Sequence, residues 1–292
     1  MSYAFIAAHS AEYPVRRLCE VLKVSPSGYY EWLKRVPSQR EQANRQLLEA
    51  IRREYTASRQ TYGSPRIHAA LRQQGIRVGR KRVARLMHGQ RWVGRSPRRK
   101  QPVTTQRALG VSAAPNRLAQ NFTASRPDET WLADITYIET GEGWCYLAVV
   151  MDLFTRQIVG WSLADHLQAT LVEHALRMAL GRRAPQPDLV HHSDRGSQYT
   201  SGLIQDLLAA HHIQVSMSGI GNCYDNAPME SCIGTLKTEA LPDLPATRAA
   251  ARRVVFEYIE VWYNRQRLHS SLGYLSPAAF ERRYVDEIES VR

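Results

Sequence analysis

One continuous stretch, residues 129–217, limits the folds open to this chain more than any other feature. It begins with three consecutive segments rich in β-branched and aromatic residues, which favour strands. A helix-like segment, a short strand, a second helix and a last strand follow. This order predicts an α/β fold in which a mixed sheet carries flanking helices. The predicted strands are 130–139, 144–155, 156–164, 188–193 and 213–218, and the predicted helices are 171–183 and 201–212.

Three carboxylate residues occupy positions that this sheet order can bring together. Asp134 lies inside the first predicted strand, among apolar residues, where a charge is costly unless it is paired or metal-bound. Asp194 directly follows the fourth strand. Glu230 falls in the first turn of a further predicted helix, which Asn226 and Pro228 begin. We therefore expect the three side chains to converge at one edge of the sheet.

A carboxylate cluster of this kind predicts phosphodiester chemistry. Cleavage and transfer need an activated oxygen nucleophile, a stabilised leaving oxygen and neutralised charge at phosphorus, and a pair of Mg²⁺ ions supplies all three. Mg²⁺ prefers oxygen ligands and keeps several waters, so a few carboxylates suffice. We predict that Asp134, Asp194 and Glu230 are catalytic and hold two ions, Mg²⁺ or Mn²⁺. Lys237, two turns further along the helix, is expected to hold a phosphate of the bound DNA.

These positions also have structural explanations. An aspartate at a strand end is often a turn residue, and a glutamate in a first helical turn is often a partner of the helix dipole. Asp152 and Asp225 are competing candidates, with Asp152 better explained by a turn and Asp225 by the ordering of the loop before the helix. For His191 and His192 we favour structural or DNA-facing roles, because oxygen-preferring ions need no imidazole.

Positive charge is concentrated in the first third of the chain. The 292 residues carry a net charge of +12, with a pI near 9.8. Residues 1–100 contain 22 Lys and Arg against 6 Asp and Glu, a net of +16, whereas residues 101–292 contain 17 against 21, a net of −4. A basic part joined to a mildly acidic one predicts a polyanion-binding module attached to another domain. A solvated basic surface is the alternative.

Residues 61–100 predict the DNA-binding module. Pro65 suits the first turn of one short helix, Gly75 ends it, and a second short helix follows Gly79. A short helix with basic residues around its first turn is what a reader of the DNA major groove presents, although a basic helix can also simply face water. The residues that we expect to bind DNA are Arg66, Arg80, Lys81, Arg82 and Arg85.

The composition predicts five regions along the chain. A second helix-turn-helix candidate, weaker than the first, lies at 15–35. A segment rich in Pro, Ser, Thr and Ala precedes the strands and predicts a linker. The regions are an N-terminal helical region at 1–60, the basic helix-turn-helix domain at 61–100, the linker at 101–126, the catalytic domain at 127–242 and a C-terminal helical extension at 243–292.

Several classes of protein are excluded by what the sequence lacks. The four cysteines contain no C-x-x-C pair, so we expect neither structural zinc nor a disulfide framework. No apolar run is long enough for a membrane span, and the N-terminus lacks the basic and apolar regions of a signal peptide. We expect a cytoplasmic protein that associates with the nucleoid. The cysteines are Cys19, Cys145, Cys223 and Cys232.

The motifs resemble those of a known family, the OrfB-type transposases of bacterial insertion sequences, whose DDE catalytic domain is similar to retroviral integrases. The resemblance covers nearly the whole chain. It includes the helix-turn-helix motifs YGSPRI at 62–67 and RVARLM at 82–87. The other matching motifs are W-x-x-DITY at 131–137, HSDRGSQYTS at 192–201, S-x-x-GN-x-YDNA-x-x-ES at 218–231, Lys237, and YN-x-x-R-x-HSSLGY-x-SP-x-x-F at 263–280.

The resemblance implies an RNase H-like fold and names Asp134, Asp194 and Glu230 as the metal-binding triad, with a basic residue at Lys237. It implies binding to double-stranded DNA, 3′-end cleavage of the element ends, strand transfer into target DNA, and homo-oligomers on paired ends. It also implies fusion to, or complex formation with, an upstream-frame protein. Retroviral integrases carry a zinc-binding His/Cys domain, whose spacing this sequence does not show.

Two other functions stay open at the level of sequence. One is an RNase H-fold nuclease that cuts DNA without joining it. The other is a DNA-binding regulator of transposition whose catalytic domain has decayed. Intact Asp134, Asp194 and Glu230 argue against decay.

Overall fold

The computed structural model describes residues 2–96, 114–219 and 223–290, and the chain divides into two compact units, Met1–Arg53 and Glu54–Arg292. The first unit contains α1 (Ser2–His9), α2 (Val15–Val21), α3 (Pro26–Lys34) and most of α4 (Gln39–Ala57). Its core consists of Ile6, Cys19 and Tyr29. The hydroxyl of Ser25 accepts a hydrogen bond from the backbone N–H of Gly28, which begins α3. The two helices predicted at 15–35 are present, and α1 was not predicted.

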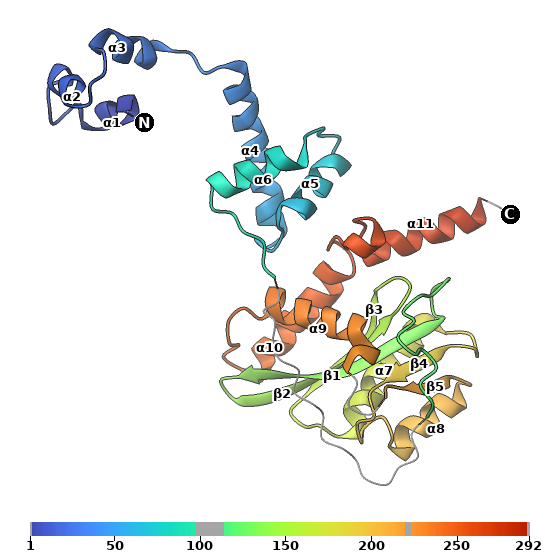
Figure 1. Cartoon of the computed structure of the whole chain (residues 1–292). Coiled ribbons are helices and arrows are strands. Elements are labelled where there is room, and N and C mark those ends of the chain that lie inside the picture. Colours follow the sequence, from blue (N-terminus) through green and yellow to red (C-terminus); the bar gives the residue numbers. More distant parts are fainter. Residues whose placement is uncertain (1, 97–113, 220–222, 291–292) are drawn as a thin grey trace. The chain divides into compact units, whose positions relative to one another are not determined.

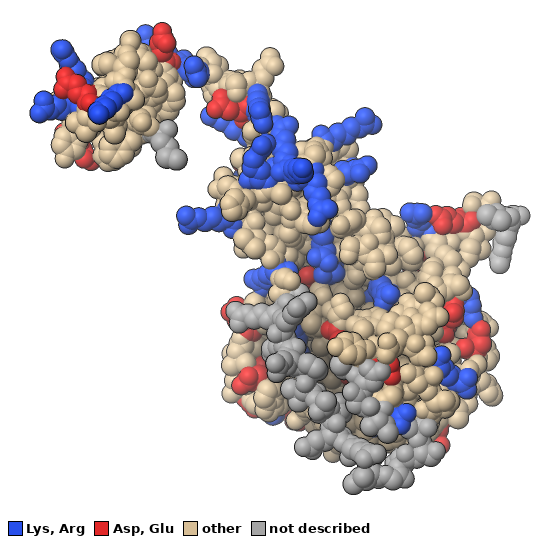
Figure 2. All heavy atoms as spheres, viewed as in Figure 1, with Lys and Arg blue, Asp and Glu red and all other residues tan. Residues whose placement is uncertain are grey.

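The second unit begins with the predicted pair of short helices. They are α5 (Ser64–Gln73) and α6 (Arg80–Gly89), and Ile67, Leu71, Val83 and Met87 bury their facing sides. Lys and Arg side chains gather over the surface that these helices form (Figure 2). The basic residues of α6 therefore remain outside this small core.

A five-stranded mixed sheet forms the centre of the second unit, in the order β3-β2-β1-β4-β5 (Figure 1). The first three strands are antiparallel, and β4 and β5 run parallel to β1. Parallel neighbours need crossover connections, and the two helices at 169–183 and 202–210 supply them. The predicted fold class and element order are confirmed. The strands are β1 (Thr130–Thr140), β2 (Gly143–Asp152), β3 (Ile158–Ala164), β4 (Val190–Ser193) and β5 (Gln214–Met217).

Helices cover both faces of the sheet. On one face, α7 (Ala169–Arg183) and α8 (Gly202–Ala210) pack against Trp131, Ala133 and Val150 of the sheet. On the other face lie α9 (Ala227–Ala240) and α10 (Arg248–Phe256), which contact β1 (Figure 1). A sheet covered on both faces buries its central strands, and this explains their nearly continuous apolar sequence.

The C-terminal extension is built into the sheet domain. After α10 the helix widens into π-helical turns (Glu257–Tyr263), and a 3₁₀ turn (Ser270–Leu272) and α11 (Pro277–Glu289) follow. The side-chain amide of Asn264 donates to the carbonyl of Ile158 and its oxygen accepts from the N–H of the same residue, both at 2.9 Å. Two hydrogen bonds to β3 thus hold the extension on the edge of the sheet.

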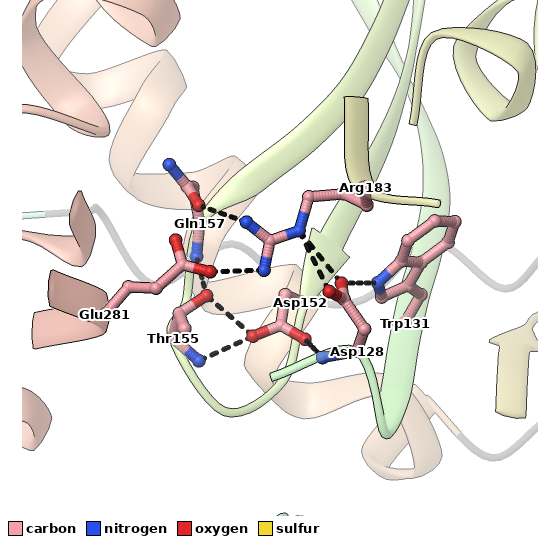
Figure 3. A network of polar contacts seen from close by, with 7 residues as sticks. All are labelled: Asp128, Trp131, Asp152, Thr155, Gln157, Arg183 and Glu281. Carbon is pink, nitrogen blue, oxygen red and sulfur yellow. Dashed lines mark hydrogen bonds and ion pairs between the residues drawn. The ribbon is translucent and has the colours of Figure 1, made fainter. Parts of the chain in front are cut away.

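A polar network fixes α11 to the start of β1 (Figure 3). Arg183, at the end of α7, pairs with Glu281 of α11 and with Asp128 before β1. The same Asp128 carboxylate accepts a hydrogen bond from the indole N–H of Trp131 at 2.9 Å. Asp152, at the end of β2, accepts from the backbone N–H of Asp128 and from Thr155. Asp152 therefore holds the β2–β3 turn, as expected for a turn residue.

A buried ion pair joins the extension to α9. Arg267 donates from Nε and Nη2 to the two carboxylate oxygens of Glu239, each at 2.8 Å, and Tyr258 donates to the same carboxylate at 2.8 Å. The side chains of Arg267 and Glu239 are only 5% and 3% exposed. Such a bidentate pair satisfies both charges away from water.

The extension is also hydrogen-bonded to α5 and to Tyr62 before it. The hydroxyl of Tyr62 accepts from the backbone N–H of Leu268 at 2.6 Å, and Nε of Arg66 donates to the carbonyl of the same residue at 2.9 Å. Gln73 donates to the carbonyl of Tyr274 at 2.8 Å. The helix-turn-helix segment is thus hydrogen-bonded to Leu268, which directly follows Arg267, and to Tyr274 further along the extension.

No helix within the described ranges combines the length and the apolar character that crossing a membrane requires.

We predict that Gly160→Ala destabilises the sheet domain. A Cβ at residue 160 would lie 2.1 Å from the carbonyl oxygen of Ala175, on α7, so the strand and the helix must separate. The expected loss is about 1–3 kcal/mol or more. The control is Gly181→Ala on the same helix, where a Cβ meets nothing within 4 Å and should stabilise the helix by about 0.5–1 kcal/mol. Urea unfolding measures both, and equal midpoints for the two variants would contradict the packing described.

We also predict that Arg267→Ala costs about 3–5 kcal/mol, because it leaves the Glu239 carboxylate buried without its cation. The control is Arg248→Ala, which breaks a more exposed pair with Asp165 and should cost about 1 kcal/mol or less. The same unfolding experiment compares them. A small loss for Arg267→Ala would show that the pair does not hold the extension.

Candidate active site

Asp134 lies in the middle of β1, half-buried, opposite Val149 of β2. Its carboxylate accepts one hydrogen bond from the N–H of Ile135 at 2.8 Å. Burial and the negative charge of Asp194 raise the pKa of Asp134 to about 7, and the charge of Glu230 adds to this rise. The positive charge of Lys237 and the Ile135 hydrogen bond act in the opposite direction. The other three predicted site residues therefore all act on the charge of Asp134.

Asp194 and Glu230 approach from two other elements. Asp194 follows β4 directly and is half-buried, and one of its oxygens accepts from the N–H of Gly196 at 2.9 Å. Burial raises its pKa. Glu230 lies in the first turn of α9 and is more exposed, yet its neighbours shield it enough to raise its pKa as well. Three carboxylates with raised pKa values thus come from a strand, a strand end and a helix start.

The three carboxylates influence one another through space without sharing a coordination centre. Among the described residues, no three His, Cys, Asp or Glu side chains form a group that could hold a metal ion. The geometric evidence for their convergence is the parallel pairing of β1 with β4, which Asp194 directly follows, and the contact of α9 with β1. The effect of Asp194 and Glu230 on the pKa of Asp134 agrees with it.

Asp225 and His192 support the loop before α9. The Asp225 carboxylate accepts hydrogen bonds from Asn116, Gln120 and the N–H of Gly219, at 2.9, 3.0 and 2.7 Å. The ring of His192 bridges Ser216 and the carbonyl of Asp225, at 2.8 and 3.0 Å. Asp225 thus orders this loop, as expected. It also holds residues from 114–126, the described part of the predicted linker, and residues 97–113 lie outside the described ranges.

Two buried residues beside the carboxylates were not predicted from the sequence to belong to the site. Asn226 was expected to cap α9, but its side chain makes no cap bond and instead donates to the carbonyl of Ala133, next to Asp134. Tyr199 is 2% exposed, and its hydroxyl has no hydrogen-bond partner within the described ranges. Burial and the charges of Asp134 and Asp194 raise its pKa well above the usual value. Both residues lie within recognisable motifs, but a motif does not say which way a side chain points.

His191 is buried against Tyr199, with ring centroids 6.1 Å apart. Burial lowers its pKa to about 4, so the ring is neutral at physiological pH. This is in line with the structural role that we favoured.

The predicted DNA-binding residues divide into two groups. Arg80, Lys81 and Arg85 are exposed on α6, and Arg82 is partly buried there. Arg66 is half-buried, bonded to Leu268 and stacked on the ring of Tyr62. Arg66 therefore supports the joint with the extension, and its contact with DNA stays a prediction.

Family models match both the helix-turn-helix region and the sheet domain of the chain. An HTH-like domain model matches residues 41–100, and two Integrase core domain models match residues 124–223 and 211–277. The chain is 44% identical over 268 residues to the insertion element IS600 uncharacterized 31 kDa protein of Shigella sonnei, covering 91% of this chain and 98% of that protein. It is 42% identical over 286 residues to transposase InsF for insertion sequence IS3A of Escherichia coli strain K12, covering 97% and 99%.

The chain belongs to the IS3 family of insertion-sequence transposases. The predicted transposase identity is confirmed, and the integrase core makes the protein a DDE-type polynucleotidyl transferase that acts on DNA. The catalytic core domain of the HTLV-2 integrase, solved in complex with magnesium, aligns with a TM-score of 0.41 and 17% identity, covering 53% of this chain and 97% of that one.

We predict that this transposase becomes more stable when Asp134 is changed to Asn, and that the gain depends on pH. The pKa of Asp134 in the fold, about 7, lies above its usual value of 3.8, so folding favours the protonated carboxyl. Wild-type stability is therefore lost as the pH rises from about 4 to about 7, whereas the Asn variant lacks this loss. The free energy of unfolding of both proteins, measured in metal-free buffer at about pH 5 and about pH 8, on either side of this pKa, tests the prediction. A gain no larger at the higher pH would contradict it.

Proposed function

We propose that this transposase binds the ends of its insertion sequence, cleaves their 3′ ends and transfers them into target DNA, with Asp134, Asp194 and Glu230 as its catalytic carboxylates. The observation that carries the proposal is the placement of the three residues in an integrase core: Asp134 and Asp194 each lie two residues beyond the paired Leu132 and His192 of β1 and β4, and α9, which carries Glu230, contacts β1. The negative charges of Asp194 and Glu230 contribute to the raised pKa of Asp134. A group with a strongly perturbed pKa beside specific charged partners is a candidate for chemistry.

The three carboxylates have the donor chemistry that divalent metal ions prefer, although their side chains do not form a ready metal-binding group in this structure. Carboxylate oxygens are the ligands that Mg²⁺ and Mn²⁺ prefer. The repulsion between Asp134 and Asp194 is the kind of charge conflict that a bound cation relieves. When bound, a pair of ions would supply an activated oxygen nucleophile and neutralise charge at the phosphate. Relatives of this fold support this proposal, since the HTLV-2 integrase core was solved with magnesium.

The chain's own residues position the reacting DNA. Lys237 lies on α9, two turns after Glu230, and its charge reaches Asp134, so it can hold a phosphate next to the carboxylates. Asn226 ties the start of α9 to β1 through the carbonyl of Ala133. The N–H of Gly196 fixes one oxygen of Asp194. These contacts set the carboxylates on rigid elements, which suits a reaction that depends on positioning.

The proposal also assigns DNA binding to α6 and includes the assembly of several copies of the chain on DNA. We assign the backbone contacts of the element end to the exposed cations of α6, namely Arg80, Lys81 and Arg85 together with the partly buried Arg82. Joining two element ends requires more than one active site, so we also propose a homo-oligomer on DNA. A solved integrase assembly, an intasome of simian T-cell lymphotropic virus, is among the similar structures. An upstream-frame partner stays a prediction from the resemblance.

Strand transfer tests the proposal. The purified chain is incubated with a labelled duplex of the element end, a supercoiled plasmid and Mg²⁺ or Mn²⁺. We expect joined product from the wild type, and a loss of about a hundredfold or more in Glu230→Gln, because an essential charge-stabilising group is removed. Binding of the duplex should survive this change.

The control is Glu287→Gln, which alters an exposed ion pair with Arg283 on α11 and should join normally. Cutting without joining by the wild type would favour a nuclease. Normal joining by Glu230→Gln would remove Glu230 from the chemistry.

A further inference from the structure

Two recesses lie along the joint between the helix-turn-helix segment and the C-terminal extension. The first is lined by residues around α5 and α6, by residues 91–96, and by Ser270 and Tyr274 of the extension. The second is lined by Arg95 and Arg66 and opens onto Thr235 and Thr238 of α9. Both share Arg66, Arg95 and Ser96, so they form one continuous groove, which we call the joint groove.

The joint groove is strongly basic. Four arginines line its first part, Arg66, Arg80, Arg91 and Arg95, and none of the described residues that line this part is acidic. In the described part of the chain, none of the four takes part in an ion pair. The acid of the second part, Glu239, is already paired with Arg267. Closely spaced, uncompensated guanidinium groups create a positive potential that favours an anion.

The shape of the joint groove is fixed by close packing. A Cβ at Gly94 would lie 2.3 Å from the backbone nitrogen of Gly63, so the two chain segments touch where only glycine fits. The N–H of Arg95 donates to the carbonyl of Thr61 at 3.0 Å, and Tyr55 donates to the carbonyl of Val93 at 3.0 Å. The segment that carries Arg91 and Arg95 is therefore held in place before any ligand arrives.

The joint groove reaches α9, the helix that also carries Glu230. Arg80, the first residue of α6, lines only the first part, and Thr235 and Thr238 on α9 line only the second part. Lys237, on the same helix, acts on the charge of Asp134. A basic track thus leads from the proposed DNA-reading helix to the helix that carries Glu230.

We propose that the joint groove binds backbone phosphates of the element-end duplex, and that the loop of the extension around Ser270 and Tyr274 is a DNA-contacting element. This inference rests on the proposed function. Guanidinium forks match phosphate oxygens, and Ser and Tyr hydroxyls commonly donate to them. The groove holds the DNA between its recognition site and its reaction site, so the extension contributes to binding as well as to the fold.

A pair of neighbouring serines tests the proposal. Ser270 lines the joint groove, whereas Ser271, exposed in the same turn, does not. Ser270→Glu places a negative charge against the DNA backbone and should weaken binding of the element-end duplex about tenfold. Ser271→Glu, the matched control, should bind like the wild type. Urea unfolding of both variants shows that each is folded.

A salt series on Arg91→Gln with Arg95→Gln gives a second measurement. Each lost phosphate contact should reduce the slope of log affinity against log salt by about 0.9, so the double variant should lose about 1.8. If the wild type joins DNA but Ser270→Glu binds like Ser271→Glu and the salt slope is unchanged, this inference is wrong and the proposed function stands. If the wild type neither binds nor joins the duplex, both are wrong.

Discussion

The buried pair of Glu239 and Arg267 is the contact on which the arrangement of the second unit depends. Glu239 belongs to α9, the helix that also carries Glu230 and Lys237, and Arg267 belongs to the extension. The next residue, Leu268, offers its backbone N–H to Tyr62 and its carbonyl to Arg66. One short segment thus connects α9, which carries Glu230, and the helix-turn-helix segment. The pair is nearly inaccessible to water, so loss of either partner would leave a buried charge.

The candidate active site places two half-buried carboxylates, Asp134 and Asp194, where ionisation is unfavourable. Burial raises the pKa values of both Asp134 and Asp194, and the negative charge of Asp194 adds to the rise at Asp134, which costs stability at neutral pH. Hydrogen bonds from Ile135 and Gly196 offset only part of this cost. Asp225 and Asp152 are better supplied with hydrogen bonds: Asp225 accepts three, and Asp152 accepts from the N–H of Asp128 and from Thr155, although burial raises the pKa of Asp152 as well. The number of hydrogen bonds that the carboxylate accepts therefore distinguishes Asp134 and Asp194 from the structural Asp152 and Asp225.

The features that could be predicted from the sequence are those with a local signal, and the features that could not be predicted depend on partners far away in the chain. Strand order followed from local composition, and Asp134 stood out because it is a charge within an apolar segment. The roles of Arg267 and Asn264 were not predictable, because their partners Glu239 and Ile158 are far away in the chain and ordinary in local sequence. The side chain of Asn226 was misjudged for a related reason: its position suits a cap, but an exposed carbonyl on β1 competes for its amide.

The rigid joint has a consequence for where DNA is cut. If α6 reads the element end and Glu230 reaches the scissile phosphate, the extension sets the distance between them through Leu268, Tyr62 and Gln73. The cleaved bond is then fixed by protein geometry and by the helical repeat of DNA, and the bases at the bond need not be read. A flexible tether between the two parts would allow cleavage at several neighbouring positions. Under the proposed function, the hydrogen bonds and close packing at this joint would thus fix the distance between the DNA bound by α6 and the bond that is cut.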